Sequence, residues 1–190
     1  IIKGTKARDV IKDLKRIDSL LLAQVKEVTL DFSESMHSIV EACFPNAMIT
    51  LDRFHHQQFC LEAVQEVRIA FRREEMTRVA NEREEFRLML KAFGLSHSLR
   101  MIFSKRCSKE DGQKSLKKWY KEVGEYGNKA FNDIAAAMYD KEDEILNYFV
   151  NRPTNAAAES LNAKIKQFRA QLRGIIDRKF FLFRLTRIYA

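Results

Sequence analysis

The feature that most constrains the fold is a long stretch, 54–93, that contains no glycine and no proline. Apolar residues recur in it at helical spacing, for example at Phe59, Ala63, Val67 and Phe71. An uninterrupted backbone with this period is typical of helix, so we predict one long helix or two abutting ones. The whole chain has only 6 glycines and 2 prolines in 190 residues, which excludes collagen-like and low-complexity structure and favours a helix-rich domain.

Two short strands are predicted ahead of this stretch. Residues 25–32 (VKEVTLDF) and 47–51 (AMITL) are rich in β-branched and apolar side chains. Between them the spacing predicts a helix that begins after Ser33, a suitable N-cap, and ends near Phe44. Strand, helix and strand with such short connections form a βαβ unit, so the strands should be parallel. An amphipathic helix is predicted over 5–25.

Further helices are predicted up to about residue 150. Residues 152–155 break the helical pattern, and a last helical stretch is expected to start within 155–158. We predict that five glycines punctuate these helices: Gly94, Gly112, Gly124, Gly127 and Gly174. The predicted fold class is therefore α+β and predominantly helical, with two short parallel strands and a large helical insertion.

Positive charge is concentrated at the C-terminal end of the chain. The net charge is +8, and residues 151–190, with nine basic and two acidic side chains, account for +7 of it. Such a segment is typical of a surface that meets phosphate backbones, although a solvated helix face is an alternative. Its basic residues are Arg152, Lys164, Lys166, Arg169, Arg173, Arg178, Lys179, Arg184 and Arg187.

Other classes of protein lack their signatures. No apolar run approaches the roughly 18 residues that span a bilayer, and no secretory leader is evident, so we expect a cytoplasmic protein. Cys43, Cys60 and Cys107 show no C-x-x-C spacing and are expected to be buried thiols. The chain has no Gly-rich phosphate loop, no G-x-S-x-G and no H-E-x-x-H, the motifs of P-loop enzymes, α/β-hydrolases and zincins.

Three carboxylates are candidates for metal chemistry. Asp31 and Asp52 lie at the carboxyl ends of the two predicted strands, where open α/β sheets place their sites, and Glu159 lies in the first turn of the last helix. Oxygen ligands of this kind suit Mg²⁺. From the spacing alone, capping and helix-dipole roles are the stronger explanation, because Asp at a strand end and Glu near a helix N-terminus are common. His55 and His56 follow Asp52 closely, as ligands, proton shuttles or structural partners.

Four blocks resemble bacterial insertion-sequence transposases of the DDE class. Residues 44–55 (FPNAMITLDRFH) and 62–68 (EAVQEVR) are similar to the family's "FPNA…DRFH…AVDEVR" segment. Residues 152–166 (RPTNAAAESLNAKIK) resemble its "R-x-T-N-G-x-x-E-G-x-N-x-x-I-K" block, and 28–33 (VTLDFS) resembles its "vtlDms" strand. The blocks occur in the family's order, and the resemblance extends over essentially the whole chain.

The resemblance implies a ribonuclease-H-like core whose carboxylates bind Mg²⁺ or Mn²⁺ and whose reaction is DNA strand cleavage and strand transfer at transposon ends. Asp31 matches the second catalytic Asp of the family, and Glu159 matches the catalytic Glu; both are expected metal ligands. Asp52 with His55 matches an Asp-x-x-His motif near the catalytic carboxylates. For these two we expect a role in organising the site, with direct metal ligation by Asp52 left open.

The resemblance also implies a division of the chain and a set of partners. A partial core would occupy 1–55, a helical insertion 56–150, and the catalytic-Glu helix with the basic segment 151–190. DNA is the expected partner of a homo-oligomer that acts at the bacterial nucleoid. Lys166, two helical turns after Glu159 on the same face, is expected to bind a DNA phosphate. The full set of expected DNA contacts is Arg152, Asn155, Asn162, Lys164, Lys166, Arg169 and Arg173.

Two departures from the family pattern affect these expectations. Ala156 and Ser160 stand where the family has glycine. The family's first three strands, with the first catalytic Asp, would lie upstream of Ile1, so the chain as given is expected to be inactive by itself. The alternative functions are a non-catalytic helical module for DNA binding or assembly and an all-helical protein-interaction domain.

Overall fold

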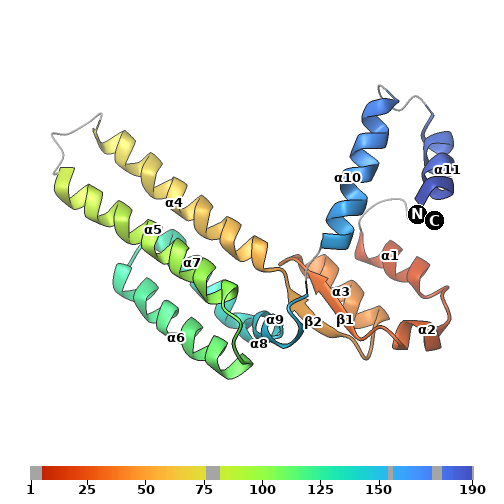
Figure 1. The fold of residues 1–190 in the computed structure, drawn as a ribbon, viewed down its shortest axis with the longest axis horizontal. Helices are drawn as coiled ribbons and strands as arrows, with labels where there is room; N and C mark the ends of the chain where they lie inside the picture. Colours follow the sequence, from red (N-terminus) through yellow and green to blue (C-terminus); the bar gives the residue numbers. More distant parts are fainter. Residues whose placement is uncertain (1–5, 76–81, 154–155, 173–176, 190) are drawn as a thin grey trace.

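The computed structural model describes residues 6–75, 82–153, 156–172 and 177–189. Within these residues helices dominate, and two strands form one small sheet (Figure 1). The predicted class, predominantly helical α+β with two parallel strands, is confirmed and is consistent with a partial ribonuclease-H-like core. The elements are α1 (Ala7–Leu14), α2 (Ser19–Ala23), β1 (Glu27–Leu30), α3 (Glu34–Cys43), β2 (Met48–Leu51), α4 (Arg53–Glu75), α5 (Glu82–Ser104), α6 (Lys109–Tyr126), α7 (Lys129–Asp140), α8 (Glu142–Leu146), α9 (Tyr148–Asn151), α10 (Ala156–Gln171) and α11 (Arg178–Tyr189).

The two strands pair in parallel, as predicted. Their register ends with Leu30 opposite Leu51, and both leucines are buried. Helix α3 joins the strands and buries Ile39, Val40 and Cys43, as its spacing predicts, whereas Met36, which the same spacing assigns to the buried stripe, is 44% exposed. Ser33 occupies the N-cap position of α3, although its side chain makes no capping hydrogen bond. The sequence therefore predicted this part of the fold from its apolar spacing and short connections.

The predicted single helix over 5–25 was wrong. The chain forms α1 and α2, which are separated by residues 15–18. The carboxylate of Asp18 accepts a hydrogen bond from the backbone N–H of Leu20 at 2.9 Å and so caps the second helix. An N-cap residue has a non-helical backbone, which ends the continuity of the helix even though the apolar spacing continues across it.

The glycine-free stretch forms two helices rather than one. Helices α4 and α5 lie side by side as a long hairpin that extends away from the sheet (Figure 1). Helices α6 and α7 pack against this hairpin, and α8 packs against β2. The amide of Asn147, between α8 and α9, donates to the carbonyl of Ile49 in β2 at 2.7 Å. The helical insertion is thereby attached directly to the sheet.

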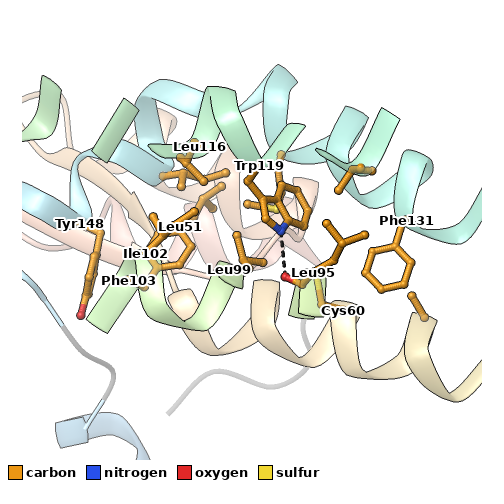
Figure 2. Packing of buried hydrophobic residues seen from close by; sticks show 14 of the residues in the cluster. Leu51, Cys60, Leu95, Leu99, Ile102, Phe103, Leu116, Trp119, Phe131 and Tyr148 are labelled. Carbon is orange, nitrogen blue, oxygen red and sulfur yellow. Dashed lines mark hydrogen bonds between the residues drawn. The ribbon is translucent and has the colours of Figure 1, made fainter. Parts of the chain in front are cut away.

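A continuous apolar core runs from the strands into the helices. Trp119 is 1% exposed, and its ring N–H donates to the carbonyl of Leu95 at 2.9 Å (Figure 2). Cys43 and Cys60 are buried free thiols, as predicted, whereas Cys107 is only half-buried. Burial raises the pKa of Cys60 to about 12, so this thiol stays protonated at neutral pH.

The prediction for the glycines was correct at Gly127 and wrong at three other positions. Gly127 ends α6 in the left-handed conformation, with φ of 70°. Gly94 lies inside α5, and Gly112 and Gly124 lie inside α6. At Gly112 a Cβ atom would lie 2.6 Å from Cε2 of Phe149, so the missing side chain serves close packing rather than a turn. Gly174 lies outside the described residues.

Helices α10 and α11 differ from the rest of the molecule in their exposure. Helix α10 begins at Ala156, within the predicted range. Among the described residues of these two helices, only Phe168 and Phe181 are buried, and their rings stack at 5.5 Å. The two helices together form the C-terminal pair, which presents nearly all of its side chains to solvent.

Candidate functional site

The site is built on the carboxyl edge of the two strands. Asp31 and Asp52 directly follow the paired residues Leu30 and Leu51, and the N–H of Asp52 donates to the carbonyl of Leu30 at 2.8 Å. Adjacent strands lie about 4.8 Å apart, so this register makes the two acidic residues neighbours. We call this end of the sheet, with Asp31, Asp52 and His55, the strand edge.

Asp31 is half-buried at the strand edge. Its Oδ1 atom accepts a hydrogen bond from the N–H of Ser33 at 2.9 Å, a local turn that orients the carboxylate. Among the described residues, its second oxygen has no hydrogen-bond partner and the carboxylate makes no ion pair. Asp31 therefore keeps an oxygen that an outside ligand can use.

Asp52 has a more enclosed position, with 5% of its surface exposed. Its Oδ1 accepts from the N–H of Phe54 at 3.1 Å, at the start of α4. Its Oδ2 lies 3.3 Å from Nδ1 of His55, whose side chain is 38% exposed. Asp52 thus caps the start of α4 and lies beside His55.

His56, which follows His55 in the sequence, has a structural role. It is fully buried, its Nδ1–H donates to the carbonyl of Asp52 at 2.8 Å, and its ring lies 4.9 Å from that of Phe32 and 5.5 Å from that of Phe103. Burial lowers the pKa of His56 from 6.5 to about 4, so the ring is neutral at physiological pH. Of the roles left open by the sequence, His56 takes that of a structural partner.

Glu159 lies in the first turn of α10, on the exposed surface. The structure does not bring it into a larger ligand cluster: in the described part of the chain, no group of three or more His, Cys, Asp and Glu side chains is placed to hold a metal. The strand edge thus joins Asp31, Asp52 and His55, while Glu159 belongs to the separate C-terminal pair.

The predicted DNA contacts fall into three groups. Asn162, Lys164, Lys166 and Arg169 lie on α10 and are exposed. Asn155 and Arg173 lie outside the described residues. The sequence did not indicate how Arg152 is used: its guanidinium donates to the carbonyls of Phe103 at 2.9 Å and of Lys105 at 2.6 Å, at the end of α5. Arg152 thus satisfies carbonyls that the helix itself leaves unpaired.

A comparison with protein families decides what kind of protein this is. A family model described as a transposase, of the DDE class and ISL3 type, matches residues 1–91 and 75–185. The chain belongs to this transposase family. Members of the family are enzymes of DNA transposition, and DNA binding and the use of divalent metal ions are general in it. Comparison with curated proteins and with solved structures gives no match.

The two expected metal ligands of this transposase, Asp31 at the strand edge and Glu159 on α10, have the donor chemistry that a divalent ion takes. Asp31 offers a carboxylate oxygen without a partner among the described residues, and Glu159 offers an exposed carboxylate. Mg²⁺ binds oxygen ligands and takes only one or two carboxylates, the remainder being waters and substrate phosphates. Asp31 and Glu159 thus have suitable donor atoms, while the described residues show no assembled cluster of three or more metal ligands.

The transposase also has a polar groove beside the strand edge. This groove of about 350 Å³ lies between the first turns of α4 and the second half of α5. The residues that line it include the cations Arg53 and Arg100 and the aromatic residues Phe54 and Phe93. The sequence offered one signal for it, since Arg53 directly follows Asp52. Within the described residues no helix is long and apolar enough to cross a membrane.

Proposed function

We propose that this chain supplies two of the metal-binding carboxylates of a DDE transposase, Asp31 and Glu159, for DNA strand cleavage and strand transfer at transposon ends. The observation that supports it most is Asp31, which follows β1 at the carboxyl edge of a parallel pair with an oxygen left for an outside ligand. The transposase family match over 1–91 and 75–185 supplies the reaction class.

The proposed roles follow from the chemistry of phosphodiesters. A bound Mg²⁺ or Mn²⁺ supplies polarisation of the attacking and leaving oxygens. Asp31, after β1, and Glu159, on α10, are the residues that would hold the ion. The Oδ2 atom of Asp52 lies 3.3 Å from Nδ1 of His55, and this histidine is 38% exposed, so it can exchange a proton with DNA or water at the strand edge.

DNA is proposed to lie along α10. Lys164, Lys166 and Arg169 are exposed on this helix, and Asn162 lies on it as well. Contacts of this kind bind phosphates and position the duplex without reading its sequence. Arg152 is left out of this set, because its guanidinium is engaged with the end of α5. The proposed working form is a homo-oligomer at paired transposon ends, acting at the nucleoid in the bacterial cytoplasm.

We also propose the division of the chain into a core over 1–55, a helical insertion over 56–150 and the catalytic-Glu helix with its basic segment over 151–190. Support comes from the direct attachment of the insertion to β2 through Asn147 and from the exposure of α10 and α11. In this proposal the insertion is a rigid continuation of the core, and the basic segment over 151–190 binds DNA.

Calorimetric titration of the chain with Mn²⁺, in the presence of a short DNA duplex, tests the proposal. Asp31→Asn and Glu159→Gln should each weaken Mn²⁺ binding by at least about tenfold, because each removes one of the few charged ligands. Glu125→Gln is the matched control: Glu125 is an exposed carboxylate on α6 that pairs with Lys121 at 3.9 Å, and its loss should leave binding unchanged.

The opposite result has a definite meaning. If the unaltered chain binds the duplex but binds no Mn²⁺, or if Asp31→Asn and Glu159→Gln bind Mn²⁺ like the Glu125→Gln control, the catalytic assignment is wrong. The chain would then be a non-catalytic helical module for DNA binding or assembly.

A further inference from the structure

The groove beside the strand edge has a composition that neither metal binding nor duplex binding explains. It lies between α4 and α5, and none of its lining side chains is acidic. The lining residues are Arg53, Phe54, Gln57, Leu61, Phe93, Ser96, His97, Arg100 and Ser104. A groove whose lining includes two arginines and no carboxylate favours the binding of anions.

The two arginines are available to such an anion. Arg100 is exposed and makes no ion pair with any described residue. The guanidinium of Arg53 lies 4.9 Å from the ring of Phe54 and 5.5 Å from the ring of Tyr148, and its Nε–H is buried without a hydrogen-bond partner in the described part of the chain. A buried donor without a partner favours a ligand that supplies an acceptor oxygen.

The aromatic side chains of the groove add a second kind of contact. Phe54 is 47% exposed and Phe93 is 52% exposed, and both line the groove. Exposed rings next to arginines match the two parts of a nucleotide. Its base can stack on an aromatic ring, and its phosphate can bind guanidinium groups. A base inside a duplex has no free face, so the matching ligand is a single strand.

We propose that this groove binds a nucleotide of single-stranded DNA, with a phosphate at Arg53 and Arg100 and a base stacked on Phe54 or Phe93. The inference rests on the proposed function, since the same DNA must reach the strand edge. The position of the groove supports it: Arg53, which lines the groove, directly follows Asp52 of the strand edge. The helical insertion thereby contributes to holding a separated DNA strand next to the site of cleavage.

The test compares binding of two short probes to the full chain, measured by fluorescence anisotropy: oligo(dT), and a backbone of the same length without bases. Phe93→Ala should weaken oligo(dT) binding by about 5- to 100-fold and leave the abasic backbone unaffected, because it removes stacking alone. Arg100→Ala should weaken both probes and lower the salt dependence of binding by about 0.7 in log–log slope.

Helix α5 provides matched controls for both variants. Phe86 is 64% exposed and Arg87 is exposed on the same helix, and neither lines the groove. Phe86→Ala and Arg87→Ala remove the same chemical groups from the same helix and should bind both probes as the unaltered chain does. Circular dichroism of all four variants should be unchanged, since every substituted side chain is at the surface.

The outcomes separate this inference from the proposed function. If Phe93→Ala and Arg100→Ala bind oligo(dT) as well as their controls do, while Lys166→Ala still loses duplex DNA, the groove is not a strand site and only this inference is wrong. If the unaltered chain binds neither single-stranded nor duplex DNA, the proposed function and the inference are both overturned. A loss of preference for oligo(dT) over the abasic backbone in Phe93→Ala alone supports the inference.

Discussion

The helical body, α4–α9, and the C-terminal pair, α10 and α11, differ in how far their side chains are buried. The helical body buries large side chains completely, including Trp119, Phe103 and Phe131. The C-terminal pair buries only Phe168 and Phe181 among its described residues and exposes several basic side chains. The helical body is stabilised by its own packing, whereas the C-terminal pair leaves nearly all of its described side chains at the surface.

The contrast explains why arginines in the two regions have different consequences. Arg152, at the end of the helical body, donates to the carbonyls of Phe103 and Lys105 and so serves the fold. Arg169, on α10, is exposed to solvent. A positive charge in the sequence therefore indicates DNA binding only where the structure leaves the side chain at the surface. Substitutions of buried side chains in the body should change stability, and substitutions of exposed basic side chains in the pair should change the affinity for duplex DNA.

The largest effect is expected at Trp119, the most voluminous fully buried side chain. Trp119→Ala should lower the free energy of unfolding by about 3–5 kcal/mol, because it creates a cavity and leaves the carbonyl of Leu95 without the indole donor. Phe180→Ala, at a site 58% exposed in the C-terminal pair, should change it by less than about 0.5 kcal/mol. Urea denaturation measures both, and similar losses would contradict the comparison.

His56 should make the helical body sensitive to acid. Burial lowers its folded-state pKa to about 4, below the ordinary 6.5, so between these values the unfolded chain binds a proton that the folded chain does not. The contribution of neutral His56 to the free energy of unfolding is therefore complete above pH 6.5. It is lost as the pH falls towards 4, by about 3 kcal/mol at most.

The measurement is urea denaturation across this pH range. His56→Phe should remove this component of the pH dependence, whereas His97→Gln, which changes an exposed histidine, should retain it. An unchanged pH dependence in His56→Phe would show that His56 does not titrate as its burial requires.

Two glycines of α6 provide a sharper test of packing. Gly112→Ala should destabilise the protein by about 1–3 kcal/mol, since the new Cβ would lie 2.6 Å from the ring of Phe149, which is itself buried and stacked on Phe103. Gly124→Ala meets nothing within 4 Å and should stabilise by about 0.5–1 kcal/mol through helix propensity. Thermal unfolding measures both, and equal shifts of the same sign would contradict the assigned role of Gly112.

The smallest effects should separate folding from DNA binding. Arg152→Ala should lower the free energy of unfolding by about 1–2 kcal/mol, because carbonyls at the end of α5 lose their donor, and leave DNA affinity unchanged. Lys166→Ala should leave stability unchanged and lower the salt dependence of duplex binding by about 0.9 in log–log slope. Unfolding curves and anisotropy titrations of both variants check this, and a DNA defect in Arg152→Ala would contradict it.

Local patterns in the sequence predicted the strands, α3 and the start of α10, because each depends on apolar spacing and on its flanking residues. The strand-edge position of Asp31 and Asp52 followed from the same reasoning. The role of Gly112 was not predictable, because it depends on Phe149, which is distant in the sequence. The role of Arg152 depends on the end of α5 in the same way. The cap at Asp18 was a local signal, but the continuing apolar spacing concealed it.

The claim that Asp31 and Glu159 hold one divalent centre is tested most directly by iron-mediated cleavage of the protein backbone. Fe²⁺ takes the place of Mg²⁺, and with ascorbate and peroxide it releases hydroxyl radicals that cut the chain beside the ion. In the presence of duplex DNA, we expect cuts near both Asp31 and Glu159, and both should disappear in Asp31→Asn. Cuts at one position only, or cuts that persist in Asp31→Asn, would contradict a shared metal centre.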